Sequence, residues 1–354
     1  MKLSPAEMRT VAGAAFALAG AFAPAHVQAQ SYQASLPPYN KVVIVIEENQ
    51  QEATIIGNRA APYTNFLATH GALLTNSYGA EHPSQPNYLS LFSGSDQNSY
   101  SDNPIPAADL PFSGPNLGSE LLHSGYSFVG YSEDLPYTGD NTSQFAAAPG
   151  DPPLTHDYAR KHNPWANWQN DAFSANIENQ GSNYLPSWTN EPFTPFAAIS
   201  ARGHFDALPT VSIVVPDQQH DDHGVTGGLS GNALFAAGDA WLQTNLSAYA
   251  TWATTHNSLL IVTWDEDDYS SINKIPTIFY GAWVKPGRYP ESQSWSFTSL
   301  INGDTEPSGA PQYTAVQGVN HWNVLRTVED IFGLPHVGQS GKVQTITDIF
   351  EPGL

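Results

Sequence analysis

The chain has 354 residues and an acidic composition, with 33 Asp and Glu against 12 Lys and Arg and a formal net charge of −21 at pH 7. Because nucleic acids and anionic membranes repel such a surface, neither is expected as a partner. Metal ions can reverse the sign of the potential inside a site, so an anionic substrate is not excluded. The absence of cysteine excludes disulfides and thiolate chemistry and agrees with a periplasmic or exported protein.

The first 29 residues have the pattern of a secretory signal peptide. Lys2 and Arg9 give a positive start, and residues 11–23 form an apolar run that is too short to span a bilayer. Small residues at 27–29 offer a cleavage site, and no later stretch is long and apolar enough to form a membrane span. We therefore expect cleavage after Ala29, a mature chain without an integral membrane segment, and a secreted or periplasmic location.

Strand and helix patterns alternate along the rest of the chain. Continuous β-branched runs such as residues 41–46 (KVVIVI) and 210–215 (TVSIVV) are typical of strands that are buried on both faces. Residues 141–195 lack such a pattern and are expected to form a loop-rich insertion. In chain order, the sequence predicts strand 41–46, helix 62–72, strand 73–78, helix 87–92, strands 127–131 and 210–215, a helix capped by Asn232, strands 259–262 and 275–284, and a helix from Asn320 to Gly333.

This alternation predicts an α/β fold, with a mixed, mostly parallel sheet and helices on both faces, in a single domain spanning residues 30–354. Three predicted strands are followed directly by acidic residues, namely Glu48, Asp217 and Asp265. Open α/β sheets bind their ligands at the carboxyl ends of the strands. The sequence therefore predicts a site at that edge.

Ser84 lies between two prolines in the stretch HPSQPNY, at the entrance of a predicted helix. A rigid turn would hold this serine near the first amides of the helix, which favour an anion. A serine at such a position is more often only a helix cap. The interpretation of Ser84 as a nucleophile therefore depends on metal ligands converging on it.

Oxygen ligands for a hard cation follow two of the predicted strands. Glu48 and Asn49 offer a carboxylate and an amide oxygen, and Asp265 and Glu266 offer two carboxylates. Such ligands suit hard divalent cations. Either pair alone is equally compatible with a solvated loop or a helix cap.

Histidines add further candidates. Residues 217–224 (DQQHDDHG) could chelate a metal or hold a phosphate, or could form an exposed turn. His321, at the start of the last predicted helix, could be a ligand or a cap residue. His162 lies in the locally basic stretch YARKHNP, which could receive a substrate phosphate or simply carry surface charge.

With these residues assembled, the chain resembles the phosphoesterase family that contains bacterial acid phosphatases and phospholipases C, which has an alkaline-phosphatase-like core. The resemblance extends from about residue 42 to residue 335. Seven pieces carry it in order: VIVIEEN, HPSQPNYLSLFSG, YSEDLP, YARKHNP, VPDQQHDDHG, VTWDEDD and NHWNVLRTVEDIFGLP.

The resemblance implies a nucleophile inside a metal site. Ser84 is similar to a serine that attacks phosphorus and also binds the metal. The other implied metal ligands are Glu48, Asn49, Asp265 and Glu266.

The resemblance also implies groups that contact substrate. Asn87 would steady a phosphoryl oxygen, and His162 would lie on the phosphate side. Asp221, His223 and His321 resemble residues that contact phosphate, assist the leaving group or bind a second metal. We assign His223 and His321 to catalysis, and Asn87, His162 and Asp221 to substrate binding.

At two candidate metal-ligand positions, this sequence differs from the two-zinc members of the family. Asp217 is followed four residues on by Asp221, where those members often have His. Glu266 also replaces a His beside Asp265. Because both changes replace nitrogen with oxygen ligands, we expect one divalent metal of a harder kind, whose identity the sequence does not specify.

The activity implied is that of a metal-dependent phosphoric-ester hydrolase, with an acid phosphatase acting through a phosphoserine as the first choice. A phospholipase C is the alternative, in which aromatic residues of 165–196 would line a groove for a lipid. The expected partner is thus a phosphorylated small molecule or a lipid head group. A third alternative, from another class, is a non-catalytic secreted protein whose Trp and Tyr residues bind carbohydrate. The oligomeric state is not predicted.

Overall fold

The computed structural model describes residues 36–144, 157–169, 183–224, 228–290, 296–297 and 316–351. All of them lie in one structural unit, Ala34–Leu354. The predicted signal peptide and the middle of the predicted insertion lie outside the described residues. Within the described residues, no helix combines the length and the apolar character needed to cross a membrane.

An eight-stranded sheet forms the centre of the fold, with strand order β5-β4-β6-β1-β7-β8-β2-β9. Neighbouring strands pair in parallel except where β8 meets β7 and β2, so the predicted mixed, mostly parallel sheet is confirmed. These strands are β1 (Lys41–Glu47), β2 (Ala72–Leu74), β4 (Phe128–Ser132), β5 (Asn190–Pro192), β6 (Val211–Val215), β7 (Ser258–Trp264), β8 (Thr277–Gly281) and β9 (Gly287–Tyr289).

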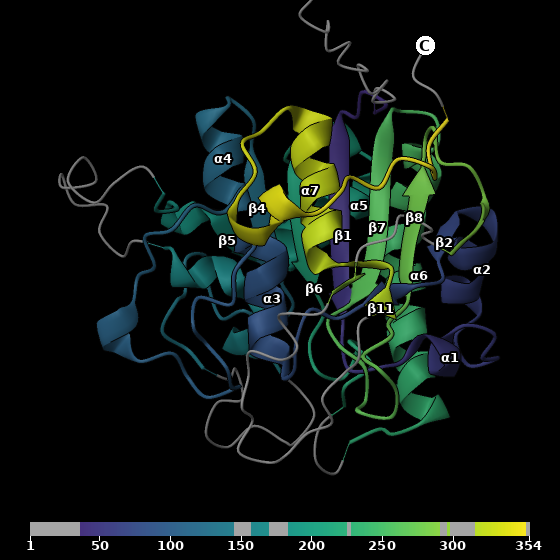
Figure 1. Cartoon of the computed structure of the whole chain (residues 1–354), viewed down its shortest axis with the longest axis horizontal. Helices are drawn as coiled ribbons and strands as arrows, with labels where there is room; N and C mark the ends of the chain where they lie inside the picture. Colours follow the sequence, from purple (N-terminus) through teal and green to yellow (C-terminus); the bar gives the residue numbers. More distant parts are fainter. Residues whose placement is uncertain are drawn as a thin grey trace, which may run out of the picture. The chain divides into compact units, whose positions relative to one another are not determined.

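Seven α-helices and two small two-stranded sheets complete the described structure. The helices are α1 (Glu52–Ile55), α2 (Pro62–His70), α3 (Ser84–Ser93), α4 (Leu117–His123), α5 (Thr194–Arg202), α6 (Asn232–Ala253) and α7 (His321–Phe332). The small sheets pair β10 (Ser296–Phe297) with β11 (Val316–Gln317), and β3 (Ser77–Tyr78) with β12 (Val319–Asn320). Figure 1 shows the helices on the two sides of the central sheet.

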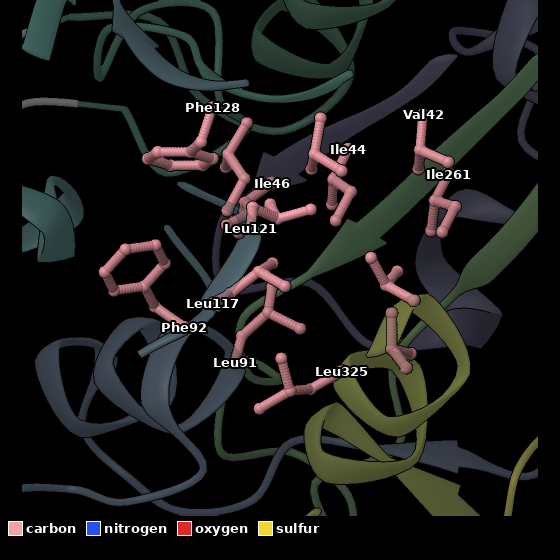
Figure 2. Close-up of a cluster of buried hydrophobic side chains, with 14 of the residues drawn as sticks. Val42, Ile44, Ile46, Leu91, Phe92, Leu117, Leu121, Phe128, Ile261 and Leu325 are labelled. Carbon is pink, nitrogen blue, oxygen red and sulfur yellow. The ribbon is translucent and has the colours of Figure 1, made fainter. Parts of the chain in front are cut away.

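The side chains of β1 explain why helices cover both faces. Successive residues of a strand point to opposite faces, and β1 is apolar on both. Val42, Ile44 and Ile46 pack on one face against side chains of α3, α4 and α7, and Figure 2 shows this cluster. Val43 and Val45 pack on the other face against α2, α5 and α6. The continuous apolar run therefore places β1 in the middle of the molecule, with its carboxyl end free to form a site.

Several predicted boundaries were wrong. The stretch 73–78 divides into β2 and β3, and strand 275–284 shortens to β8. Helix α3 begins at Ser84 and not after Pro86, because proline in the first helical turn loses no intrahelical hydrogen bond. Asn232 is the first residue of α6 and does not cap it, since Gly231 holds the cap position.

Other local signals were correct. The side chain of Asn320 accepts a hydrogen bond from the amide of Trp322 and forms a capping box at the start of α7. Gly333 ends α7 with a φ of 64°, in the left-handed region that glycine tolerates best. The region 141–195 is irregular where it is described, apart from 3-10 turns, the short edge strand β5 and the start of α5 at Thr194.

Candidate active site

Ser84 opens α3, and the side chains around it come from the carboxyl ends of two neighbouring strands. Its hydroxyl oxygen lies 3.1 Å from Oε2 of Glu48, which follows β1, and 3.1 Å from Oε1 of Glu266, which follows β7. The amide oxygen of Asn49 is 3.3 Å away. The structure thus brings together four of the five residues that the resemblance assigned to a metal.

The surroundings of Ser84 contain more hydrogen-bond acceptors than donors. One hydroxyl hydrogen cannot serve three oxygens. If the amide of Asn49 is turned over, its nitrogen lies 3.2–3.3 Å from the oxygens of Ser84, Glu48 and Glu266, and its two hydrogens can serve two of them. With the amide oxygen facing inward, the same atoms form a ring of oxygens, as a hard cation requires.

Asp265, the fifth residue, adjoins this ring. Its Oδ1 accepts from the amides of Asn49 at 3.0 Å and Glu266 at 2.6 Å. Its Oδ2 is buried without a hydrogen-bond partner. A buried carboxylate oxygen is costly to leave unpaired, so a ligand at this position would stabilise it.

His162 and Asp221 lie on the other side of Glu48. Nε2 of His162 is 3.0 Å from Oε1 of Glu48, and its Nδ1 is 3.7 Å from Oδ2 of Asp221. The amide of Glu48 donates to the carbonyl of Asp221 at 2.6 Å, which ties the loop after β6 to the end of β1. These three side chains offer ligand atoms within 4.8 Å of one another, so they could also hold a metal ion.

The carboxylates of the site repel one another. Burial raises the pKa of Asp221 and Asp265 well above the ordinary range, and the charge of Glu48 adds to both shifts. Burial also raises the pKa of Glu266 to about 7, although His82 opposes this shift. Glu48 differs, because His162 overcomes the effect of burial and lowers its pKa. A divalent cation would offset this concentration of negative charge.

His223 faces the same ring. Its backbone amide donates to Oδ1 of Asp221 at 2.9 Å, and its Nδ1 donates to the carbonyl of Gly224 at 2.6 Å. Its Nε2 lies 3.3 Å from the amide oxygen of Asn49 when that amide is turned over. The ring is therefore fixed through Nδ1 and presents Nε2 to the site.

His321 contacts the main chain of the site. Its Nε2 lies 2.5 Å from the carbonyl oxygen of Asp265, to which it donates. Burial lowers the pKa of His321 to about 4, so the ring is neutral at pH 7. Its contact is thus with the main chain that carries two candidate ligands.

Asn87 holds the turn that presents Ser84. Its two amide hydrogens go to the carbonyls of Glu81 at 2.8 Å and Pro83 at 3.0 Å, and its oxygen accepts from the amide of Glu81 at 2.9 Å. In this arrangement it has no hydrogen left for a phosphoryl oxygen. The contact of Asn87 with a phosphoryl oxygen, implied by the resemblance, stays a prediction.

Sequence reasoning missed His82, which lies two residues before Ser84. Its Nδ1 is 2.5 Å from Oε2 of Glu266, and its Nε2 is 3.4 Å from Oδ1 of Asp267. Burial opposes protonation, but these two acids raise the pKa of His82 to about 9. The resulting imidazolium orients Glu266, whose other oxygen faces Ser84. Only the proximity of His82 to Ser84 in the chain could have suggested it.

The loop 217–224 divides between two sites. Asp221 and His223 contact the ring around Ser84, whereas His220 pairs with Asp217 and with Glu133, which follows β4. Nδ1 of His220 lies 2.9 Å from Oε2 of Glu133 and 3.0 Å from Oδ1 of Asp217. These three side chains form a second group that could hold a metal. As a hydrogen-bonded cluster, it holds Asp217 in an ion pair.

This ion pair predicts a pH-dependent contribution to stability. Burial lowers the pKa of His220, but its hydrogen bonds to Asp217 and Glu133 outweigh this effect and raise the pKa to about 10. His220→Gln should therefore lower the free energy of unfolding by about 1 kcal/mol at about pH 6, a value reduced by solvent screening of the partly exposed ring. The contribution is complete below the unfolded pKa of about 6.5 and is lost as the pH rises through the folded value.

Urea unfolding of His220→Gln and wild type at about pH 6 and about pH 10 measures this difference. The variant His204→Gln, at an exposed position, is the matched control. A difference that grows with pH would contradict the assignment.

A model of the phosphoesterase family matches residues 48–335. The chain belongs to this family. The matched segment runs from Glu48 to Pro335, and it includes every residue of the ring around Ser84.

Proteins similar to this phosphoesterase carry phosphatase names. It is 40% identical over 319 residues to a phosphatidylinositol-3-phosphatase of Mycobacterium tuberculosis, covering 89% of this chain and 84% of the relative. It is 24% identical to a probable acid phosphatase of Kluyveromyces lactis, covering 88% of this chain and 62% of the relative. The family and these relatives make the protein a phosphoric-ester hydrolase, so the non-catalytic, carbohydrate-binding alternative is set aside.

Among solved structures, the phosphoesterase is similar to a protein of the alkaline phosphatase superfamily from Vibrio parahaemolyticus. The TM-score is 0.52 at 10% sequence identity, over 88% of this chain and 72% of the other. At this identity the likeness concerns the fold, and it confirms the predicted alkaline-phosphatase-like core.

Several aromatic residues in the described part of 165–196 lie in the core and do not line a groove for a lipid. Trp165, Trp168 and Phe196 are completely buried and pack in the core. Trp165 and Trp168 contact Phe92 of α3 edge to face, so they support the helix that begins with Ser84. Trp188 is the large aromatic side chain that remains exposed among the described residues of this region.

Proposed function

We propose that this phosphoesterase is a metal-dependent phosphomonoesterase in which Ser84 is the nucleophile. The observation that carries the proposal is the convergence of three oxygens on the Ser84 hydroxyl at 3.1–3.3 Å. The proposed metal ligands are Glu48, Asn49, Ser84, Asp265 and Glu266. Since all of them are oxygen ligands, we propose one hard divalent cation.

The residues of the site divide the reaction into two displacements. When bound, a divalent cation would lower the pKa of the serine hydroxyl and neutralise charge on the phosphoryl oxygens. The Ser84 oxygen attacks phosphorus in line with the ester bond, which breaks as the new bond forms. The serine proton leaves towards a carboxylate at 3.1 Å, and His223 protonates the leaving oxygen. Water then hydrolyses the phosphoserine and restores Ser84.

The remaining candidates are proposed to position these groups. His162 and Asp221 hold Glu48 from the side away from Ser84 and border the place of the phosphoryl group. His321 fixes the main chain at Asp265, and Asn87 fixes the turn that carries Ser84.

A phosphomonoester is the proposed substrate class. The relative that shares 40% identity is named a phosphatidylinositol-3-phosphatase, and the fungal relatives are named acid phosphatases. These names support removal of a terminal phosphate, from a small molecule or from a lipid head group. The pattern of residues 1–29 supports a secreted or periplasmic location as part of the proposal.

Hydrolysis of p-nitrophenyl phosphate, measured beside that of p-nitrophenyl phosphorylcholine, tests the substrate class. Each divalent cation is added back in turn after EDTA treatment. The proposal predicts that the monoester has the higher kcat/KM. A higher kcat/KM for the phosphorylcholine diester would replace the phosphomonoesterase with a phospholipase C.

A further inference from the structure

Lys161 is connected through Asp102 to Gln85, the residue that follows the nucleophile. Its Nζ is 2.7 Å from Oδ2 of Asp102, and Oδ1 of the same carboxylate accepts from the backbone amide of Gln85 at 2.9 Å. Gln85 is the residue after Ser84. One carboxylate therefore links the ammonium group to the first turn of α3.

The two ends of this connection are held firmly. The buried side chain of Gln85 donates to the carbonyls of Ser101 at 2.6 Å and Asn103 at 3.0 Å, which fastens the segment around Asp102 to α3. On the lysine side, the neighbouring His162 contacts Glu48 at 3.0 Å. Hydrogen bonds through Asp102 and Gln85 therefore tie Lys161 to the first turn of α3, and the ion-pair contact of His162 holds the same stretch against Glu48.

Lys161 is the cation of the YARKHNP stretch that interacts electrostatically with Glu48 and Asp265. Arg160 is buried and donates to Oδ1 of Asn167 at 2.6 Å and to the carbonyl of Asn141 at 2.8 Å. Its guanidinium group therefore holds together residues of the insertion. Only 16% of the Lys161 side chain is exposed. Burial lowers its pKa, but Glu48, Asp102 and Asp265 outweigh this effect and raise the pKa. Lys161 is thus protonated and within the field of the site's carboxylates.

A cation in addition to the imidazolium of His82 would favour a strongly anionic substrate at this site. Glu48, Asp221, Asp265 and Glu266 bring more negative charge than one divalent cation neutralises when they are ionised. A phosphomonoester carries nearly two negative charges at neutral pH, whereas a diester carries one. The dianion therefore depends more on an additional positive charge. An ammonium group has three donor hydrogens, and the ion pair with Asp102 uses one of them.

We propose that Lys161 binds a terminal oxygen of the substrate phosphoryl group and makes the site prefer dianionic phosphomonoesters, with Asp102 as its positioning residue. This inference rests on the proposed function, because it assigns the substrate class at the same site. It names the residue that separates monoester from diester.

The test compares Lys161→Met, Lys161→Arg and Asp102→Asn with wild type. Lys161→Met should lower kcat/KM for p-nitrophenyl phosphate by about 10- to 100-fold and that for p-nitrophenyl phosphorylcholine by less than about threefold. Lys161→Arg should recover part of the loss, and Asp102→Asn should raise KM for the monoester more than it lowers kcat. Lys342→Met, at an exposed position, should change neither ester.

Calorimetric binding of inorganic phosphate, in the presence of each of Mg2+, Ca2+, Mn2+ and Zn2+, separates failure of the inference from failure of the function. Suppose that wild type hydrolyses the esters. If Lys161→Met then lowers kcat/KM for both esters by the same factor, or for neither, the inference is wrong and the function stands. If wild type is inert but phosphate binding weakens about tenfold or more in Lys161→Met, the proposed function is wrong and the anion site stands. Phosphate binding that is the same in both proteins would overturn the inference in either case.

Discussion

Ser84→Ala is expected to lower kcat/KM for phosphomonoesters by about 10,000-fold or more, because loss of a covalent nucleophile removes the whole two-step route. The fold should not change. The Ser84 side chain is small, and its hydroxyl is surrounded by acceptors that it cannot all satisfy. Initial rates with p-nitrophenyl phosphate, with the thermal unfolding midpoint of each protein, measure both effects.

Ser90→Ala is the matched control for this variant. Ser90 is buried in the same helix, and its hydroxyl makes one long hydrogen bond, 3.4 Å to Glu81. The Ser90→Ala variant should retain activity within a few-fold of wild type. Near-normal turnover by Ser84→Ala would show that Ser84 is not the nucleophile.

Removal of divalent cations is expected to abolish activity and to lower stability together. A cation that binds only the folded protein stabilises it by about 2.7 kcal/mol when its free concentration is about 100 Kd. EDTA treatment should therefore lower the unfolding midpoint, and adding the cation back should restore it. Asp265→Ala should show no activity and little response of the midpoint to the cation, because the variant loses an oxygen ligand at the edge of the ring.

Asp268→Ala provides the control within the same acidic run. Asp268 is exposed and accepts hydrogen bonds from Ser270. Its replacement should leave the response to the cation unchanged. An Asp265→Ala variant that is stabilised by the cation as much as wild type would show that the cation binds elsewhere, for instance at the group Glu133, Asp217 and His220.

The parts of the fold that the sequence predicted are those with a strong local pattern. Residues 42–46 of β1 are apolar and buried at every position, so only a central strand fits this run. Asn320 and Gly333 mark the ends of α7 through backbone requirements that few residues meet. Boundaries failed where local chemistry allows two outcomes, as with Pro86, which a helix accepts in its first turn.

The sequence predicted the candidate ligands that gather around Ser84, but not the residues that support them. Glu48 and Asp265 directly follow apolar strands, so strand order alone brings them near one another. His82 and Glu266 are 184 residues apart, and Lys161 and Asp102 are 59 apart. No periodicity or spacing relates such pairs, because the relation arises only when the chain has folded.

The stereochemistry at phosphorus tests the central claim most directly. A monoester made chiral at phosphorus by oxygen isotopes is turned over by the metal-loaded enzyme, and the phosphoryl group is trapped on an alcohol acceptor. Two in-line displacements, the first by Ser84 and the second by the acceptor, predict net retention of configuration. Net inversion would mean that the acceptor attacks phosphorus directly, and it would contradict a phosphoserine on Ser84.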